Sequence, residues 1–141
     1  MRTIGILLMA LVVVLASCKK EDDAPKFTSA EGDWTYTTPD GKINVFFTIV
    51  NGAAGWSITN VAMHVEGVAG NANVDATGIN PPTITNIRIN ANDTKLTYPF
   101  PIEFKNGTVN SDFTQINVPD ATYTWPHDKT NILTNIAITR K

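Results

Sequence analysis

The sequence predicts an all-β protein built as a single antiparallel two-sheet sandwich. From about residue 27 onward the chain is divided into eight or nine short runs rich in Val, Ile, Thr and aromatic residues, which favour strands. Gly, Pro, Asn and Asp separate these runs roughly every 8–12 residues, a spacing typical of sandwiches and barrels. Several runs alternate apolar and polar residues, and none shows the 3.6-residue period of an amphipathic helix.

The first three predicted strands follow one another through glycine-containing turns. The run 34–38 stops at Pro39-Asp40-Gly41, where proline fixes its own φ and glycine accommodates backbone angles that other residues avoid. The run 43–50 ends at the small and turn-forming residues 51–55. In the third run, 56–66, apolar residues alternate with polar ones, which indicates a strand with one face on a core.

The middle of the chain continues in shorter pieces. A run at 74–76 lies between Gly70 and Gly78, and the run 83–90 follows the breaker Asn80-Pro81-Pro82. Alternation of Ile with polar residues in the second of these runs again favours a strand.

The following segment is predicted to form a hairpin. The runs 95–98 and 102–105 lead to Asn106-Gly107, a pair that favours tight hairpin turns, and the returning strand begins at 108–109. We therefore expect the chain to reverse at this pair.

The last predicted strands complete the domain. The runs 112–118 and 121–125 are split by Pro119-Asp120, and the chain ends on the alternating run 132–140. Prolines are expected at strand ends or edges, where the missing N–H does no harm.

A short pattern, apolar-Thr-Asn-apolar-x-apolar, occurs three times within the domain. Its copies are separated by 26 and 49 residues, so a solenoid of fixed period is not expected. Either the pattern repeats by chance, because few residue types favour strands, or the asparagines lie on one exposed ladder. The copies are residues 58–63, 84–89 and 133–138.

The N-terminus is predicted to be a secretion signal that covers residues 1–17. Arg2 provides a positive start, and the apolar run 4–16 is too short to span a bilayer as a helix. Leu15-Ala16-Ser17-Cys18 resembles the lipobox of bacterial lipoproteins. The resemblance implies cleavage before Cys18, lipidation of its thiol and acylation of the new amino terminus. As this is the chain's sole cysteine, no intramolecular disulfide is expected.

Residues 18–26 are predicted to be a lipidated, charged and flexible tether. Its segment Lys19-Lys20-Glu21-Asp22-Asp23 is similar to the export signal of surface lipoproteins in the Bacteroidota. The similarity implies an outer-membrane lipid anchor with display at the cell surface, and a periplasm-facing lipoprotein is the alternative. The membrane, reached through this lipid, is thus the first expected partner.

The charge and the length of the remaining domain, residues 27–141, limit its possible functions. The full chain has 11 basic and 13 acidic residues, and loss of Arg2 with the signal leaves a net charge of −3. That balance offers no basic surface for nucleic acid. The length suits one domain with one core.

The sequence favours a function without catalysis. The histidines are His64, predicted on the outward face of its strand, and His127 in a loop, and the one thiol is assigned to lipid. The chain contains no glycine-rich phosphate loop and no spaced set of metal ligands, so neither a cofactor nor a metal site is predicted.

The leading functional hypothesis is a non-enzymatic binding or structural module on an immunoglobulin-like sandwich. The loop that contains Trp125, His127 and Asp128 combines an amphipathic ring with polar groups, which suits a glycan or protein ligand. These three residues are the predicted ligand-binding site.

The alternative hypothesis is a carrier. Gly32-Asp33-Trp34 resembles the Gly-x-Trp motif of lipocalin-type barrels. The resemblance implies a β-barrel that holds a small apolar ligand, and the predicted cavity lining is Phe46, Ile58, Met63 and Phe104.

Overall fold

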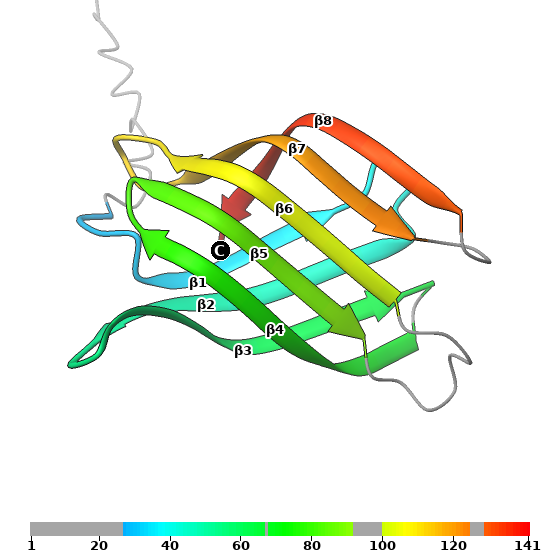
Figure 1. Ribbon diagram of the computed structural model, residues 1–141, viewed down its shortest axis with the longest axis horizontal. Coiled ribbons are helices and arrows are strands. Elements are labelled where there is room, and N and C mark those ends of the chain that lie inside the picture. The colour runs from blue at the N-terminus through cyan, green and yellow to red at the C-terminus, as the bar shows by residue number, and fades with distance from the viewer. Residues whose placement is uncertain (1–26, 67, 92–99, 125–128) are drawn as a thin grey trace, which may run out of the picture.

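The computed structural model describes residues 27–66, 68–91, 100–124 and 129–141, and this part consists of eight strands (Figure 1). Within these ranges no helix has the length and hydropathy needed to cross a membrane. The strands are β1 (Gly32–Thr37), β2 (Ile43–Gly52), β3 (Gly55–Val65), β4 (Val68–Asn80), β5 (Thr83–Ala91), β6 (Phe100–Val109), β7 (Gln115–Thr124) and β8 (Thr130–Arg140).

The strands form one antiparallel sheet that closes into a barrel. Each strand pairs with the next in the chain, and β8 returns to β1, where Trp34 lies opposite Arg140 and Thr35 opposite Thr139. The all-β class and the barrel alternative are confirmed, and the single continuous sheet corrects the expectation of an immunoglobulin-like two-sheet sandwich. Strand and turn signals are shared by both architectures, so they do not reveal whether the first and last strands meet.

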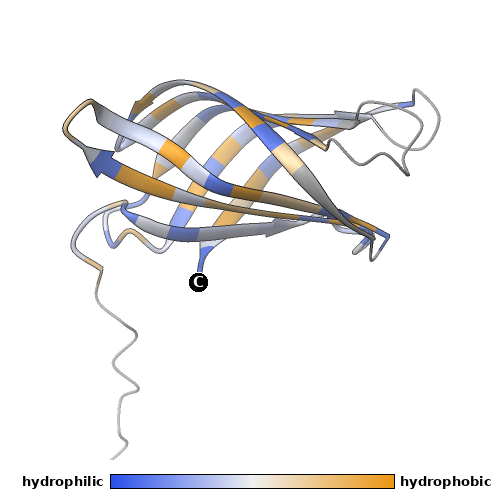
Figure 2. Ribbon diagram, turned by 90° about the horizontal axis from the view of Figure 1, so that it is seen from below, coloured by the Kyte–Doolittle hydropathy of each residue, from blue (hydrophilic) through white to orange (hydrophobic). Residues whose placement is uncertain are grey.

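The alternation of residue types along the strands builds the core. On β2, Ile43, Val45, Phe47 and Ile49 face the interior and are at most 1% exposed, whereas the residues between them face outward. Along several strands of the ribbon, orange and blue bands alternate, as expected where apolar and polar residues alternate (Figure 2). Each such side chain contributes about 1.5–3 kcal/mol when it is fully buried, so the inward face holds the barrel together.

The recurring Thr-Asn pattern has a structural role. In β5 the buried side chains are those of Ile84, Ile87 and Ile89, so the consecutive residues Thr85 and Asn86 both lie outside the inward series. The copies in β3 and β8 interrupt the inward series in the same way. Because β3, β5 and β8 are not neighbours, the asparagines do not form one ladder. The pattern instead marks where a strand bends as the sheet curls.

This bend continues across β4 to β8. The pairs on either side place Gly78, Thr85, Asn106, Pro119 and Asn135 along one line across the sheet, where the regular pairing is interrupted. Gly78, Asn106 and Asn135 have φ of 61°, 57° and 52°, a left-handed backbone that Gly and Asn tolerate better than other residues. The line therefore bends five strands together.

The hairpin prediction at Asn106-Gly107 is wrong, because both residues lie inside β6. A Cβ added to Gly107 would meet Ile116 Cγ2 at 3.0 Å, so the tight packing there suits glycine. The chain reverses after β6 instead, where Asn110 Oδ1 accepts hydrogen bonds from the backbone N–H groups of Thr114 and Gln115, both at 2.9 Å. Pro119 likewise lies within β7 and does not end a strand.

One end of the barrel is closed by the segment that precedes β1. Trp34 Nε1 donates a hydrogen bond to the Ala30 carbonyl at 3.1 Å, and Arg140 Nη1 donates to the Ser29 carbonyl at 2.6 Å. The Arg140 guanidinium also lies 3.8 Å from the centre of the Phe27 ring. Gly32 has a φ of 134°, and a Cβ there would meet Arg140 at 2.6 Å. The Gly-x-Trp motif therefore joins the segment before β1 to the end of β8.

Candidate functional site

The side chains expected to line a carrier cavity are divided between the two faces of the barrel. Ile58, Met63 and Phe104 face the interior, where they are 8%, 0% and 2% exposed. Phe46 lies on the outer face, where its ring meets the His64 ring edge-on at a centroid distance of 5.5 Å. Met63 and Phe104 expose almost no surface to water, so neighbouring side chains pack closely around them in the interior.

Two tyrosines lie toward the ends of β1 and β7 that are remote from the closed end. Burial, with smaller contributions from Tyr123 and the Asp40 carboxylate, raises the pKa of Tyr36 to about 12. The pKa of Tyr123 is also raised, chiefly by burial and then by Asp40. Tyr36 Oη is buried and has no hydrogen-bond partner among the described residues, and its ring packs edge-on against Phe104 at 5.5 Å. Both phenols therefore stay neutral near pH 7 and are not activated as bases or nucleophiles.

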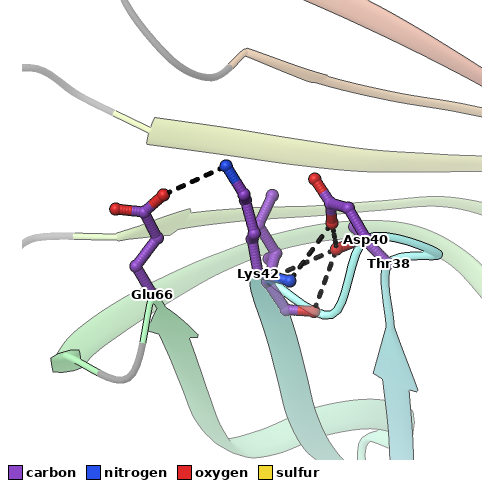
Figure 3. A network of polar contacts seen from close by, with 5 residues as sticks. Thr38, Asp40, Lys42 and Glu66 are labelled. Carbon is purple, nitrogen blue, oxygen red and sulfur yellow. Dashed lines mark hydrogen bonds and ion pairs between the residues drawn. The ribbon is translucent and has the colours of Figure 1, made fainter.

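A polar network fixes the β1–β2 turn at the same end (Figure 3). Thr38 Oγ1 donates to Asp40 Oδ1 at 2.5 Å, and the Lys42 backbone N–H donates to the same oxygen at 3.1 Å. These bonds lower the pKa of Asp40, the Thr38 bond most. Lys42 Nζ lies 3.4 Å from Glu66 Oε1, in an ion pair whose side chains are half-exposed. The network orders the turn, and the solvated ion pair adds little stability.

A first hollow, of about 280 Å³, opens on the outer face of β1, β2 and β3. Lys141 Nζ lies 4.6 Å from the centre of the Phe46 ring in its wall. Thr48 Oγ1 donates to Asp33 Oδ1 at 2.6 Å, and Asn60 Nδ2 donates to Thr48 Oγ1 at 3.5 Å. The polar groups of this hollow thus bind one another, which leaves them little capacity for a ligand.

A second hollow, of about 410 Å³, opens on the outer face of β6, β7 and β8. We name it the amide hollow, because four of its nine lining residues carry carboxamide side chains. The sheet arranges six of the nine lining residues in two rows across the three strands, and the second row lies on the bend. The first row is Thr108, Asn117 and Ala137, and the second is Asn106, Pro119 and Asn135.

The amide hollow has free hydrogen-bonding capacity. The side chains of Asn106 and Asn135 are exposed and make no hydrogen bond within the described part of the chain, whereas Asn117 Oδ1 accepts one from Gln115 Nε2. Each free carboxamide presents one acceptor oxygen and two N–H donors. Ala137, opposite Asn117, has a small side chain that leaves room between the amides.

The predicted ligand-binding residues Trp125, His127 and Asp128 lie outside the described residues, as does Cys18. His64 lies on the outer face of β3, half-buried against Phe46. In the four described ranges, no three His, Cys, Asp or Glu side chains are grouped to hold a metal ion.

A search of protein families, curated proteins and solved structures finds no match to this chain. The candidate site is therefore identified from its geometry alone. Sequence reasoning missed the amide hollow because Asn106 and Pro119 predict turns and strand breaks rather than places on one surface. The available signal is the outward-facing alternation of polar residues along β6 and β7, but it is informative only once neighbouring strands are known.

Proposed function

We propose that this chain is a non-enzymatic envelope lipoprotein that binds a ligand on the outer face of its barrel. Acyl chains on Cys18 hold it in the outer membrane, and the charged residues that follow direct it to the cell surface, with a periplasm-facing position as the alternative. The support for the anchor is the lipobox sequence together with its single cysteine.

The contrast between the filled interior and the open amide hollow carries the binding part of the proposal. Met63 and Phe104, two side chains that a carrier would use, are covered by their neighbours. Asn106 and Asn135, in contrast, offer amides without a hydrogen-bond partner among the described residues to solvent on the outer face. Ligand sites combine a hollow with a few convergent polar groups, and the outer face provides both.

A carrier of a small apolar ligand is the second candidate, and Tyr36 is the observation that favours it. Its hydroxyl is buried toward the end of a closed barrel without a hydrogen-bond partner among the described residues. A ligand polar group that reached Tyr36 Oη would satisfy it, since an unpaired buried hydroxyl is costly. This candidate requires the neighbouring core to open.

Titration with a neutral fluorescent apolar probe, N-phenyl-1-naphthylamine, separates the two candidates. The processed chain, residues 18–141 with Cys18→Ser to remove the lipid site, is used so that no detergent competes for the probe. Outer-face binding predicts no saturable probe binding, and Tyr36→Phe should not alter the fluorescence. Stoichiometric binding that Tyr36→Phe weakens would establish the carrier and refute the outer-face proposal.

A further inference from the structure

The chemistry of the amide hollow points to one class of ligand, and we propose that it binds a neutral carbohydrate chain. This inference rests on the proposed function, since it takes the outer face of the barrel as the binding surface. Thr108 contributes a hydroxyl, and Asn106 and Asn135 contribute free carboxamides. Sugar hydroxyls donate and accept hydrogen bonds at once, and a carboxamide meets both roles with adjacent atoms.

The charge distribution favours a neutral ligand. None of the nine residues that line the hollow is charged. Beside the bend row, Lys105 on β6 lies opposite Asp120 on β7, and its Nζ lies 3.2 Å from Glu103 Oε2, so this lysine is already compensated by a carboxylate. A phosphate, carboxylate or nucleic acid ligand requires uncompensated Lys or Arg side chains, which this lining lacks.

The backbone holds the amides in place before a ligand arrives. Asn106 and Asn135 have left-handed φ values of 57° and 52° between paired segments of their strands, and both lie level with Pro119, whose ring fixes its own φ. Polar groups fixed in this way lose little conformational entropy on binding. The exposed Pro119 ring between them is an apolar surface for the C–H face of a pyranose ring.

The size of the hollow sets the expected binding mode. Its volume of about 410 Å³ suits a small molecule, and its position on the outer face of the barrel lets a longer chain run past on either side. A protein partner would need about 800 Å² of buried surface per side, usually with aromatic or Arg anchors. The residues that line the hollow include no aromatic side chain and no Arg. A shallow sugar site is weak alone, and many copies on one membrane would raise the avidity.

Two charge substitutions in the hollow test the proposal. Asn106→Asp and Asn135→Asp keep a residue that tolerates left-handed backbone but remove the two N–H donors. The matched control is Asn73→Asp, an exposed asparagine on β4. Each protein, as residues 18–141 with Cys18→Ser, is titrated calorimetrically with gluco-, manno-, xylo- and chito-oligosaccharides, and with oligogalacturonate as the acidic comparison. Thermal melts verify that all variants fold.

The expected result is binding of at least one neutral oligosaccharide, weakened by about twofold to tenfold in each hollow variant and unchanged in Asn73→Asp. Binding that neither hollow variant weakens would overturn the assignment of the site while leaving an outer-face binding protein intact. The neutral-carbohydrate proposal would be overturned if the protein without hollow substitutions bound oligogalacturonate alone, or bound none of the sugars. Failure of the proposed function itself is distinguished by stoichiometric binding of the apolar probe.

Discussion

Removal of the Trp34 side chain should destabilise the barrel more than any exposed substitution. Trp34 is 0% exposed, its indole N–H binds the Ala30 carbonyl at 3.1 Å, and the Arg140 guanidinium lies 5.7 Å from its ring. Truncation of a buried Trp to Ala costs about 3–5 kcal/mol, because both transfer energy and packing are lost. For a domain near 115 residues, a loss of that size lowers Tm by more than about 10 °C.

Two matched variants separate the contributions. Trp34→Phe fills most of the volume but leaves the Ala30 carbonyl without its indole donor, so it should cost about 1–3 kcal/mol. Trp56→Ala removes the same kind of side chain from a half-buried position on β3 and should cost less than Trp34→Ala. Urea unfolding followed by far-ultraviolet circular dichroism provides the free energies. Equal losses for Trp34→Ala and Trp56→Ala would refute the role of Trp34 as the closure of the barrel end.

Three further predictions concern the anchor, the tether and the buried phenol. Cys18→Ala should abolish incorporation of a labelled fatty acid, because the thiol is the only site for the linkage, and continued labelling would contradict the lipoprotein assignment. Alanine at residues 20–23 should retain the lipoprotein on the inner side without changing its thermal melt, and equal cleavage by protease on whole cells would reduce the segment to a spacer. Since burial raises the pKa of Tyr36 from 10.0 to about 12, the unfolded chain loses the phenolic proton first. The associated stability is present below pH 10 and is lost as the pH rises toward 12, so Tyr36→Phe should flatten the unfolding free energy over that interval. An unchanged pH dependence would show that Tyr36 is not buried as described.

The sequence predicts strand content and several turns well because both depend on local chemistry. The turn at Pro39-Asp40-Gly41 and the break at Asn80-Pro81-Pro82 separate strands as expected. Proline and glycine act there through their own backbone limits, which do not depend on the rest of the fold.

The closure of the sheet and the amide hollow depend on long-range pairing and were not predictable in the same way. Asn106-Gly107 has the left-handed preference of a hairpin turn, but strands on both sides of β6 hold the pair within the sheet. Its backbone freedom therefore produces a bend. Asn135 becomes part of the same surface because β8 pairs with β7. No local sequence signal predicts that pairing.

The most direct test of outer-face binding is a titration of backbone amide chemical shifts in residues 18–141 with Cys18→Ser, using the neutral oligosaccharide that binds best. The account predicts that shifts concentrate at Asn106, Asn117 and Asn135 and their strand neighbours, with the core residues Met63 and Phe104 unchanged. Shifts centred on Tyr36, Met63 and Phe104 instead would contradict it, since the ligand would then lie inside the barrel.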